Sequence, residues 1–214
     1  MNEIYNILSW EWSKIIQSVA SIITVVFAYR ALTIWKLKAQ ANKKTEFIDV
    51  LIDEVHKFTT LVQPAIKDYK VIKMSVDNHN RIDKLVNNNP PLPYKTYITE
   101  AGAQDSDRLS TKLKECVNTM SKIRSLVVKG QIYDFIDYDK CQEASNLILH
   151  QYNRLAKVVF MINPGLFLEN PKVQESLFAA LSQEPEDMEN CLKEQNIKLL
   201  KFARKNYVKI YKNT

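Results

Sequence analysis

The residues best suited to catalysis in this 214-residue chain are few and widely separated. The three histidines, His56, His79 and His150, lie far apart, and no motif of a phosphate-binding loop, a zinc protease or a serine hydrolase occurs. No arginine precedes a histidine at the spacing of four to six residues that small helical nucleases of bacterial defence often use. The sequence therefore predicts a protein that is not an enzyme and needs no cofactor. One alternative stays open: a site formed by distant residues such as His150 and Glu143.

Four acidic residues lie close together in the sequence near the last predicted helix, and their carboxylates could ligate a metal ion. These residues are Glu184, Glu186, Asp187 and Glu189. They stand where a helix is expected to begin, so we interpret them as complementing the positive end of that helix, and we predict no metal site. Cys116, Cys141 and Cys191 are isolated in the sequence, which is typical of small buried apolar residues in a reducing compartment.

Cations are concentrated near the end of the chain. Residues 192–214 contain seven lysines and arginines against one carboxylate, in a chain of formal net charge +6. Five of them recur at helical spacing and form one stripe: Lys198, Lys201, Lys205, Lys209 and Lys212. The stripe could be a solvated face, a site for a nucleic acid or a phosphorylated small molecule, or a surface that lies against acidic lipid. Because lysine dominates over arginine, sequence-specific nucleic-acid binding is not expected.

The longest uncharged run covers residues 15–29, with Trp12 before it and Arg30 and Trp35 after it. An apolar centre, aromatic residues at both ends and cations on one flank are typical of a single membrane anchor. A helix from Trp12 to Trp35 rises roughly 35 Å, enough to cross a bilayer. A buried core helix and a cleavable signal peptide are the alternatives. Arg30 disfavours both, because it would interrupt the buried face and would lie inside the cleavage site.

The cations around this run are distributed unequally, which predicts an orientation. Only Lys14 precedes the apolar run, whereas five cations follow it: Arg30, Lys36, Lys38, Lys43 and Lys44. The positive-inside rule then puts the N-terminus outside and residues 36–214 in the cytoplasm.

Small and polar residues recur within the predicted anchor on one helix face. They are Gln17, Ser21, Thr24, Ala28 and Ala31. Such a stripe lets membrane helices pack closely and share hydrogen bonds, so we predict a homo-oligomer. The alternative is that the hydroxyl groups bond only to their own helix backbone.

The rest of the chain shows helical periodicity almost throughout, and the scarcity of glycine argues against a sandwich or a barrel. We predict an all-α protein, one N-terminal transmembrane helix followed by a cytoplasmic helical bundle. The expected parts are an interfacial segment and anchor over 1–40, a juxtamembrane helical arm over 41–86, an Asn/Pro-rich loop over 87–104 and a C-terminal bundle over 105–214.

Within these parts, local signals predict where the elements begin and end. Pro64 should kink or restart the arm. Residues 94–104 alternate briefly and are expected to be extended. Asp105 or Ser106 should cap the next helix, which should end at Gly130. Further helices are expected over 133–162, from the pair Asn170–Pro171, and from the acidic group to the C-terminus.

The junction from Thr33–Trp35 to Lys43–Phe47, directly after a short anchor, resembles a large group of uncharacterised bacterial single-pass proteins that carry a cytoplasmic helical domain. The layout is also similar to membrane effectors of bacterial phage defence. The resemblance implies a cytoplasmic domain that senses infection or a nucleotide signal and membrane helices that respond. Together with the basic stripe and the small and polar stripe, it predicts a non-enzymatic inner-membrane effector or sensor that oligomerises through its anchor and binds an anionic ligand or a protein partner. A scaffold that recruits a cytoplasmic partner is the alternative. No motif is shared, so no functional residue is transferred.

Overall fold

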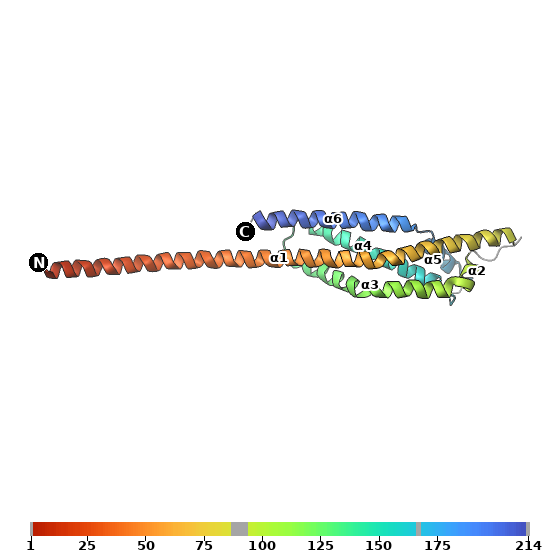
Figure 1. Cartoon of the computed structure of the whole chain (residues 1–214), viewed down its shortest axis with the longest axis horizontal. Coiled ribbons are helices and arrows are strands. Elements are labelled where there is room, and N and C mark those ends of the chain that lie inside the picture. Colours follow the sequence, from red (N-terminus) through yellow and green to blue (C-terminus); the bar gives the residue numbers. More distant parts are fainter. Residues whose placement is uncertain (1, 87–93, 166–167, 213–214) are drawn as a thin grey trace. The chain divides into compact units, whose positions relative to one another are not determined.

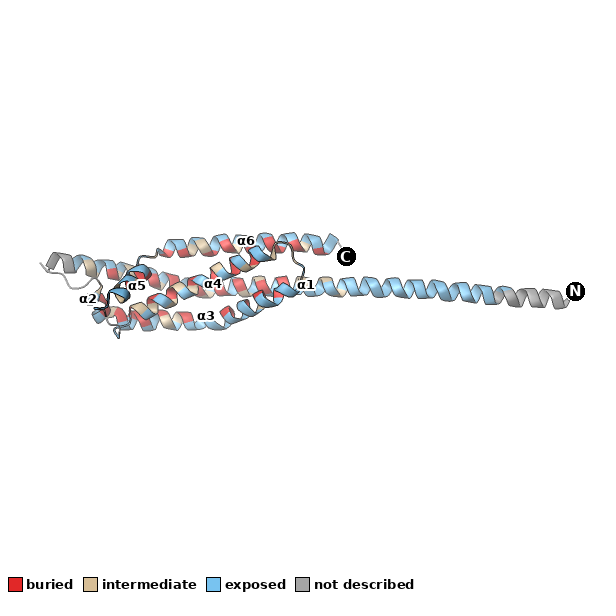
Figure 2. Cartoon of the chain, turned by 180° about the vertical axis from the view of Figure 1, so that it is seen from behind, coloured by how far each residue is buried: buried red, intermediate tan, exposed pale blue. Residues whose placement is uncertain are grey.

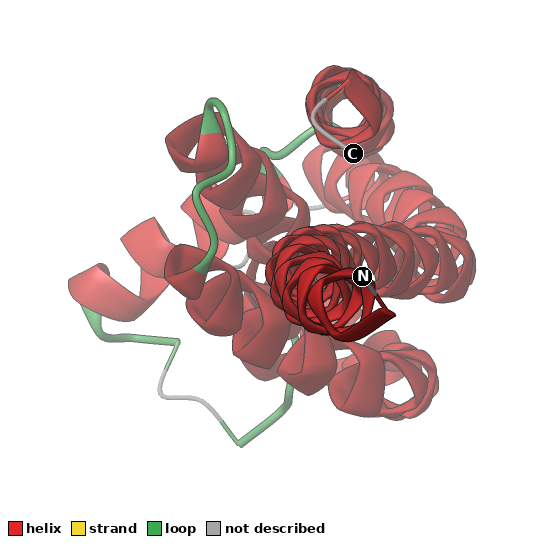
Figure 3. Ribbon diagram, turned by 90° about the vertical axis from the view of Figure 1, so that its left-hand side faces the viewer, coloured by secondary structure: helices red, strands yellow, loops and turns green. Residues whose placement is uncertain are grey.

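The computed structural model describes residues 2–86, 94–165 and 168–212, which are helical apart from short connections (Figures 1 and 3). Its elements are α1 (Asn2–Val86), α2 (Lys95–Tyr97), the π-helical turn η1 (Ile98–Gly102), α3 (Ala103–Lys129), the 3₁₀ turn η2 (Gly130–Ile132), α4 (Tyr138–Met161), α5 (Pro171–Leu181) and α6 (Pro185–Lys212). No strand occurs among the described residues, so the all-α prediction is confirmed. The chain divides into two compact units, one of residues 1–46 with 207–214 and one of residues 47–206.

Residues 47–206 form a bundle in which each long helix runs antiparallel to its neighbours. Hydrogen bonds and ion pairs that cross between helices give the directions: Glu54 of α1 meets Lys122 of α3, and Asp68 meets Arg108. At the two ends of α3, Ser106 bonds to Val159 of α4, and Val127 accepts from Tyr138. Gln151 of α4 contacts Cys191 of α6, and Ile136, two residues before α4, bonds to Asn206 near the other end of α6. Successive long helices therefore alternate in direction, as in an up-down-up-down four-helix bundle.

The bundle part of α1 supplies one continuous buried face. Its side chains recur every three or four residues and are almost inaccessible to solvent: Ile48, Leu51, Val55, Phe58, Val62, Ile66, Tyr69, Ile72 and Val76 (Figure 2). The helix continues through Pro64, so the predicted restart there is wrong. Pro64 lacks the N–H that would bond to the carbonyl of Thr60, and both residues are exposed, so water can satisfy that carbonyl.

Residues 95–104 are helical, so the predicted extended loop is wrong for this part, and residues 87–93 lie outside the described residues. The buried hydroxyl of Tyr97 donates to Asp105 Oδ2 at 2.7 Å, and Arg108 pairs with the other oxygen of Asp105 at 2.9 Å. Asp105 and Ser106 therefore lie inside a continuous helical segment and cap nothing. Gly102 lies where a Cβ atom would come within 2.3 Å of the carbonyl oxygen of Ile162, so only glycine allows this approach to α4.

Helix α3 ends where predicted, with Gly130 as its C-cap, but α4 begins at Tyr138 and not at Tyr133. The preceding segment is held out of a helix by Asn206 of α6, which accepts from the Ile136 N–H at 2.8 Å and donates to its carbonyl at 3.1 Å. The side chain of Phe135 lies at the centre of an aromatic cluster, with its ring centroid 5.4–5.8 Å from those of Phe47, Tyr133, Tyr138 and Phe202.

The connection between α5 and α6 is fastened to α1 by polar contacts. The Tyr69 hydroxyl lies 2.8 Å from the Gln183 carbonyl oxygen and 3.0 Å from that of Ala180. Burial raises the pKa of Tyr69, so its hydroxyl remains a donor. At the start of α5, the side chain of Asn170 accepts from the Lys172 N–H at 3.0 Å, which confirms the predicted cap and its first-turn Pro171.

Gly130→Ala should destabilise the bundle. An added Cβ atom would lie 1.9 Å from the Tyr138 hydroxyl oxygen and 2.6 Å from the Phe47 ring. Both rings belong to the aromatic cluster, so we expect a loss of about 1–3 kcal/mol in the free energy of unfolding. Denaturant unfolding of the full chain in detergent measures this. Gly165→Ala is the matched control, since its nearest neighbour is a side-chain oxygen at 3.4 Å. Equal stability of the two variants would contradict the proposed close packing at Gly130.

Tyr69→Phe should also be destabilising, by about 1–3 kcal/mol, because it leaves carbonyl groups at the α5–α6 connection without their buried donor. Tyr152→Phe serves as control, since the described residues give the half-buried Tyr152 no hydroxyl partner, and its effect should stay within about 0.5 kcal/mol. Thermal unfolding followed by circular dichroism compares the two. A Tyr69→Phe variant as stable as the control would show that this hydrogen bond does not hold the connection in place.

Candidate functional site

The first candidate site is the N-terminal part of α1. Every described side chain from Trp12 to Lys38 is exposed, and the helix from Lys14 to Lys38 is pale blue in Figure 2. Over the candidate span Lys14–Ile82, the most apolar window has a mean hydropathy of 1.7 and none of its residues is buried. One helix near the N-terminus is thus long and apolar enough to cross a membrane. Full exposure distinguishes this window from the core helix of a soluble domain, in which the apolar side chains are covered.

The predicted self-association stripe lies on this exposed helix, but two of its polar groups are occupied. The Ser21 hydroxyl donates to the Gln17 carbonyl at 2.8 Å, and the Thr24 hydroxyl donates to the Ala20 carbonyl at 2.9 Å. Their donors are therefore satisfied within the helix, as the alternative interpretation expected. Two features of the stripe remain available to a neighbouring helix. Its small residues, including Ala28 and Ala31, allow close approach, and the side-chain amide of Gln17 can form hydrogen bonds.

The second candidate site is the basic stripe of α6, whose five lysines lie in different surroundings. Lys205 lies 2.5 Å from Asp137 Oδ2, and this contact with that of Lys140 holds the pKa of Asp137 below its usual value. Lys198 and Lys201 are exposed on the bundle unit, and no described residue forms an ion pair with them. Lys209 and Lys212 belong to the unit that contains residues 1–46. The five lysines are thus not one uniform site.

An apolar stripe on the outer face of α6 was missed by the sequence analysis. Ile197, Leu200 and Val208 are about half exposed and Tyr211 more so, next to the lysines. These positions fall within a sector of roughly 80° on a helical projection, opposite the buried Leu199. These four residues are spaced three, eight and three apart, which indicates one helix face. The sequence pattern did not reveal this face because the buried apolar residues of α6 recur with the same helical period.

The acidic group at the start of α6 contributes to packing. Glu184 forms an ion pair with Lys73, and Glu186 lies 2.5 Å from Lys70, both lysines belonging to α1. The hydrogen bond from Lys70 lowers the pKa of Glu186. Across the described part of the chain, no group of three or more His, Cys, Asp or Glu side chains is arranged to hold a metal ion.

The residues considered for catalysis are dispersed. His150 and Glu143 are exposed on α4, two helical turns apart, while His79 Nε2 lies 3.3 Å from a Glu100 carboxylate oxygen. Burial raises the pKa of Cys116 to about 11 and that of Cys141 to about 12, so both remain protonated thiols of low nucleophilicity.

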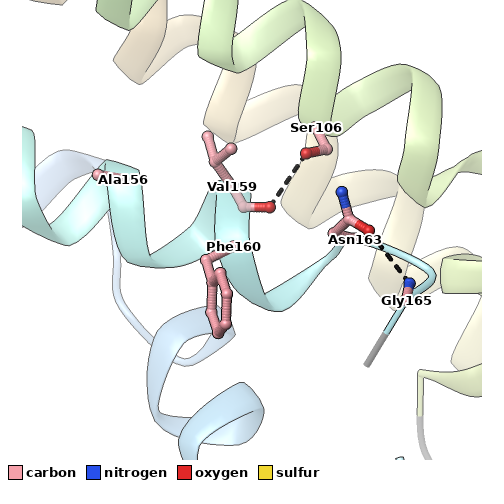
Figure 4. A pocket seen from close by; sticks show the side chains of 6 residues that line it. All are labelled: Ser106, Ala156, Val159, Phe160, Asn163 and Gly165. Atoms are coloured by element: carbon pink, nitrogen blue, oxygen red, sulfur yellow. Dashed lines mark hydrogen bonds between the residues drawn. The ribbon is translucent and has the colours of Figure 1, made fainter. Parts of the chain in front are cut away.

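Two open pockets lie along the α3–α4 seam, with volumes of about 530 and 260 Å³. Figure 4 shows the larger one, lined by Ser106, Ala156, Val159, Phe160, Asn163 and Gly165. Its two polar side chains are already engaged. Ser106 donates to the Val159 carbonyl at 3.0 Å, and Asn163 Oδ1 accepts from the Gly165 N–H at 3.1 Å. The lining therefore presents no nucleophile with an adjacent base.

Comparisons with protein-family models, with curated proteins and with solved structures found no match.

Gln17→Leu should weaken self-association of the anchor, because it removes the amide that can bond to a neighbouring helix. Hydrogen bonds between membrane helices average about 0.6 kcal/mol, so we expect a roughly threefold lower association constant. Crosslinking in native membranes at native expression measures the dimer fraction. Ser18→Leu, a polar residue off the stripe, is the matched control. Only monomer in the unsubstituted protein would contradict the prediction.

Proposed function

We propose that this chain is a membrane-anchored, non-enzymatic helical effector or sensor of the bacterial inner membrane. Its N-terminus lies outside, and its bundle binds an anionic ligand or a protein partner in the cytoplasm. The observation that carries the proposal is that α1 supplies both a fully exposed apolar window and the central buried face of the bundle. The proposed anchor and the bundle therefore share one helix.

The exposed window supports the membrane location by its energetic cost in water. Side chains such as Ile22, Val25 and Phe27 are each more than three-fifths exposed. Full burial of a side chain of this size is favourable by roughly 1.5–3 kcal/mol, and the window contains many of them in succession. Lipid covers all sides of a helix at once, whereas a partner protein covers only one face. The exit from the window is basic, which favours a cytoplasmic bundle.

The outer face of α6 supports the binding role. Lys198, Lys201 and Arg204 are exposed beside Ile197 and Leu200. Cations next to apolar side chains suit a phosphorylated ligand with an apolar portion, or an acidic and apolar surface of a protein. Binding there would bias the bundle between two arrangements, and α1 would pass the change to an oligomer of anchors. The layout is similar to that of membrane effectors of bacterial phage defence, which is the basis of this mechanism.

The half-exposed Ile197 and Leu200 also favour a second candidate, a scaffold that recruits a cytoplasmic protein. In that case the bundle would keep one arrangement, and the anchor would serve only to hold the partner at the membrane. The two candidates differ in whether occupation of α6 changes crosslinking between anchors.

Insertion into the membrane tests the proposal directly. The double substitution Ile22→Lys/Val26→Lys puts two charges in the middle of the window, at about 2.5–3.5 kcal/mol each during insertion. We expect the unsubstituted protein to stay in the membrane pellet after alkaline carbonate extraction, and the variant to leave it. The matched control is Val71→Lys/Met74→Lys, which alters side chains of similar exposure on the bundle. Extraction of the unsubstituted protein by carbonate would refute the proposal.

A further inference from the structure

The end of the chain belongs to the same compact unit as the anchor. Residues 207–214 group with residues 1–46, although more than 160 positions separate them in sequence. Ile210 is buried, and α1 itself becomes partly covered from Ala39 onward. The last turns of α6 thus add their side chains to the basic flank of the apolar window.

This flank gathers positive charge. Its cations, which we call the basic collar, are Arg30, Lys36, Lys38, Lys43, Lys44, Lys209 and Lys212. Among the described residues of the unit, Glu46 is the only acidic side chain on this side of the window. Among the described residues, none of the seven cations forms an ion pair. Seven like charges within one compact unit repel each other, so a counter-anion from outside the chain would stabilise the unit.

The collar also carries aromatic side chains suited to an interface. The rings of Tyr207 and Tyr211 stack with centroids 6.4 Å apart, and Tyr211 is 69% exposed. Trp35 of α1 is similarly exposed at 65%. Tyrosine and tryptophan favour the headgroup region of a bilayer, where the ring is partly buried and its polar group stays wet. Lysine, which makes up six of the seven cations, suits diffuse attraction to a charged surface better than bidentate recognition.

We propose that the basic collar binds acidic phospholipid headgroups of the leaflet at the C-terminal flank of the anchor, and that Lys209 and Lys212 of α6 take part. This inference rests on the proposed function, because it requires the window to lie in a bilayer. A cluster of four to eight cations next to a membrane helix is the pattern that concentrates acidic lipid. The end of the chain is then held at the leaflet by charge, in addition to its packing in the unit.

A simpler role for Lys209 and Lys212 is to complement the negative end of α6, since both lie in its last turn. That role affects helix stability and has no dependence on lipid charge. The test therefore has to measure which lipids surround the collar.

The experiment uses the full chain with Trp10→Phe and Trp12→Phe, so that Trp35 is the only tryptophan and reports on the lipids beside the collar. It is reconstituted into two sets of vesicles with the same ratio of phosphatidylglycerol to phosphatidylcholine. Bromine, which quenches tryptophan fluorescence, is carried by the acidic lipid in one set and by the neutral lipid in the other. We expect about twofold stronger quenching per brominated acidic lipid, falling toward equality at high salt.

Lys209→Gln/Lys212→Gln should reduce this preference, and Lys209→Arg/Lys212→Arg should retain it. The matched control Lys198→Gln/Lys201→Gln removes the same charge from the bundle unit and should leave the preference unchanged. Circular dichroism confirms that each variant keeps its helices.

Equal quenching in the two vesicle sets would overturn the inference and favour an acidic protein surface as the counter-anion. A preference that survives Lys209→Gln/Lys212→Gln would remove α6 from the collar and overturn the role assigned to its lysines. Carbonate extraction of the same protein separates these outcomes from failure of the proposed function, because an inserted anchor without lipid preference contradicts only the inference.

Discussion

Helix α1 must satisfy two different environments along one backbone. Residues 15–29 carry no charged side chain, are apolar except on the small and polar stripe, and have exposed side chains. From Ile48 to Val76, by contrast, one apolar face is buried. A helix apolar all round is stable where the medium is apolar, and an amphipathic one where other helices cover a single face. The other helices therefore have to cover one face of residues 48–76 and leave residues 15–29 uncovered. The bundle does so by placing α3, α4 and α6 against residues beyond Phe47.

Apolar contacts alone would not fix the register of these helices, because many sliding positions bury similar area. Directional contacts at each end of the bundle part of α1 supply that information. At one end, Tyr69 bonds to the α5–α6 connection and Lys73 pairs with Glu184. At the other end, the Phe135 ring packs against Phe47, and Asn206 uses its side-chain oxygen and nitrogen on the backbone of Ile136. A buried amide that is left unpaired is costly, so a slip of one turn at α6 would be strongly disfavoured.

The parts of the fold that sequence alone predicted are those determined by neighbouring residues. The helical period marked the buried face of α1, Asn170–Pro171 marked the start of α5, and Gly130 marked the end of α3. The predictions were wrong where contacts between residues far apart in the sequence determine the local structure. The helical segment over 95–102 packs against the end of α4, where Gly102 approaches the Ile162 carbonyl, and α4 begins late because Asn206 bonds to Ile136. In the candidate sites, the hydroxyls of Ser21 and Thr24 look available in the sequence, but local bonds to the backbone occupy them.

A stripe of like charges in a sequence becomes a site only through its surroundings. From Lys198 to Lys212 the helix rises roughly 21 Å, which is longer than a small phosphorylated ligand can bridge. Lys205 is already paired with Asp137, and Lys209 and Lys212 lie in the unit that contains residues 1–46. A compact anion can therefore engage only neighbours one turn apart, such as Lys198 and Lys201. We therefore propose different partners for the two parts of α6. The part in the unit with residues 1–46 would face a broad charged surface, and the part in the bundle would bind a compact ligand or a protein face that also covers Ile197 and Leu200.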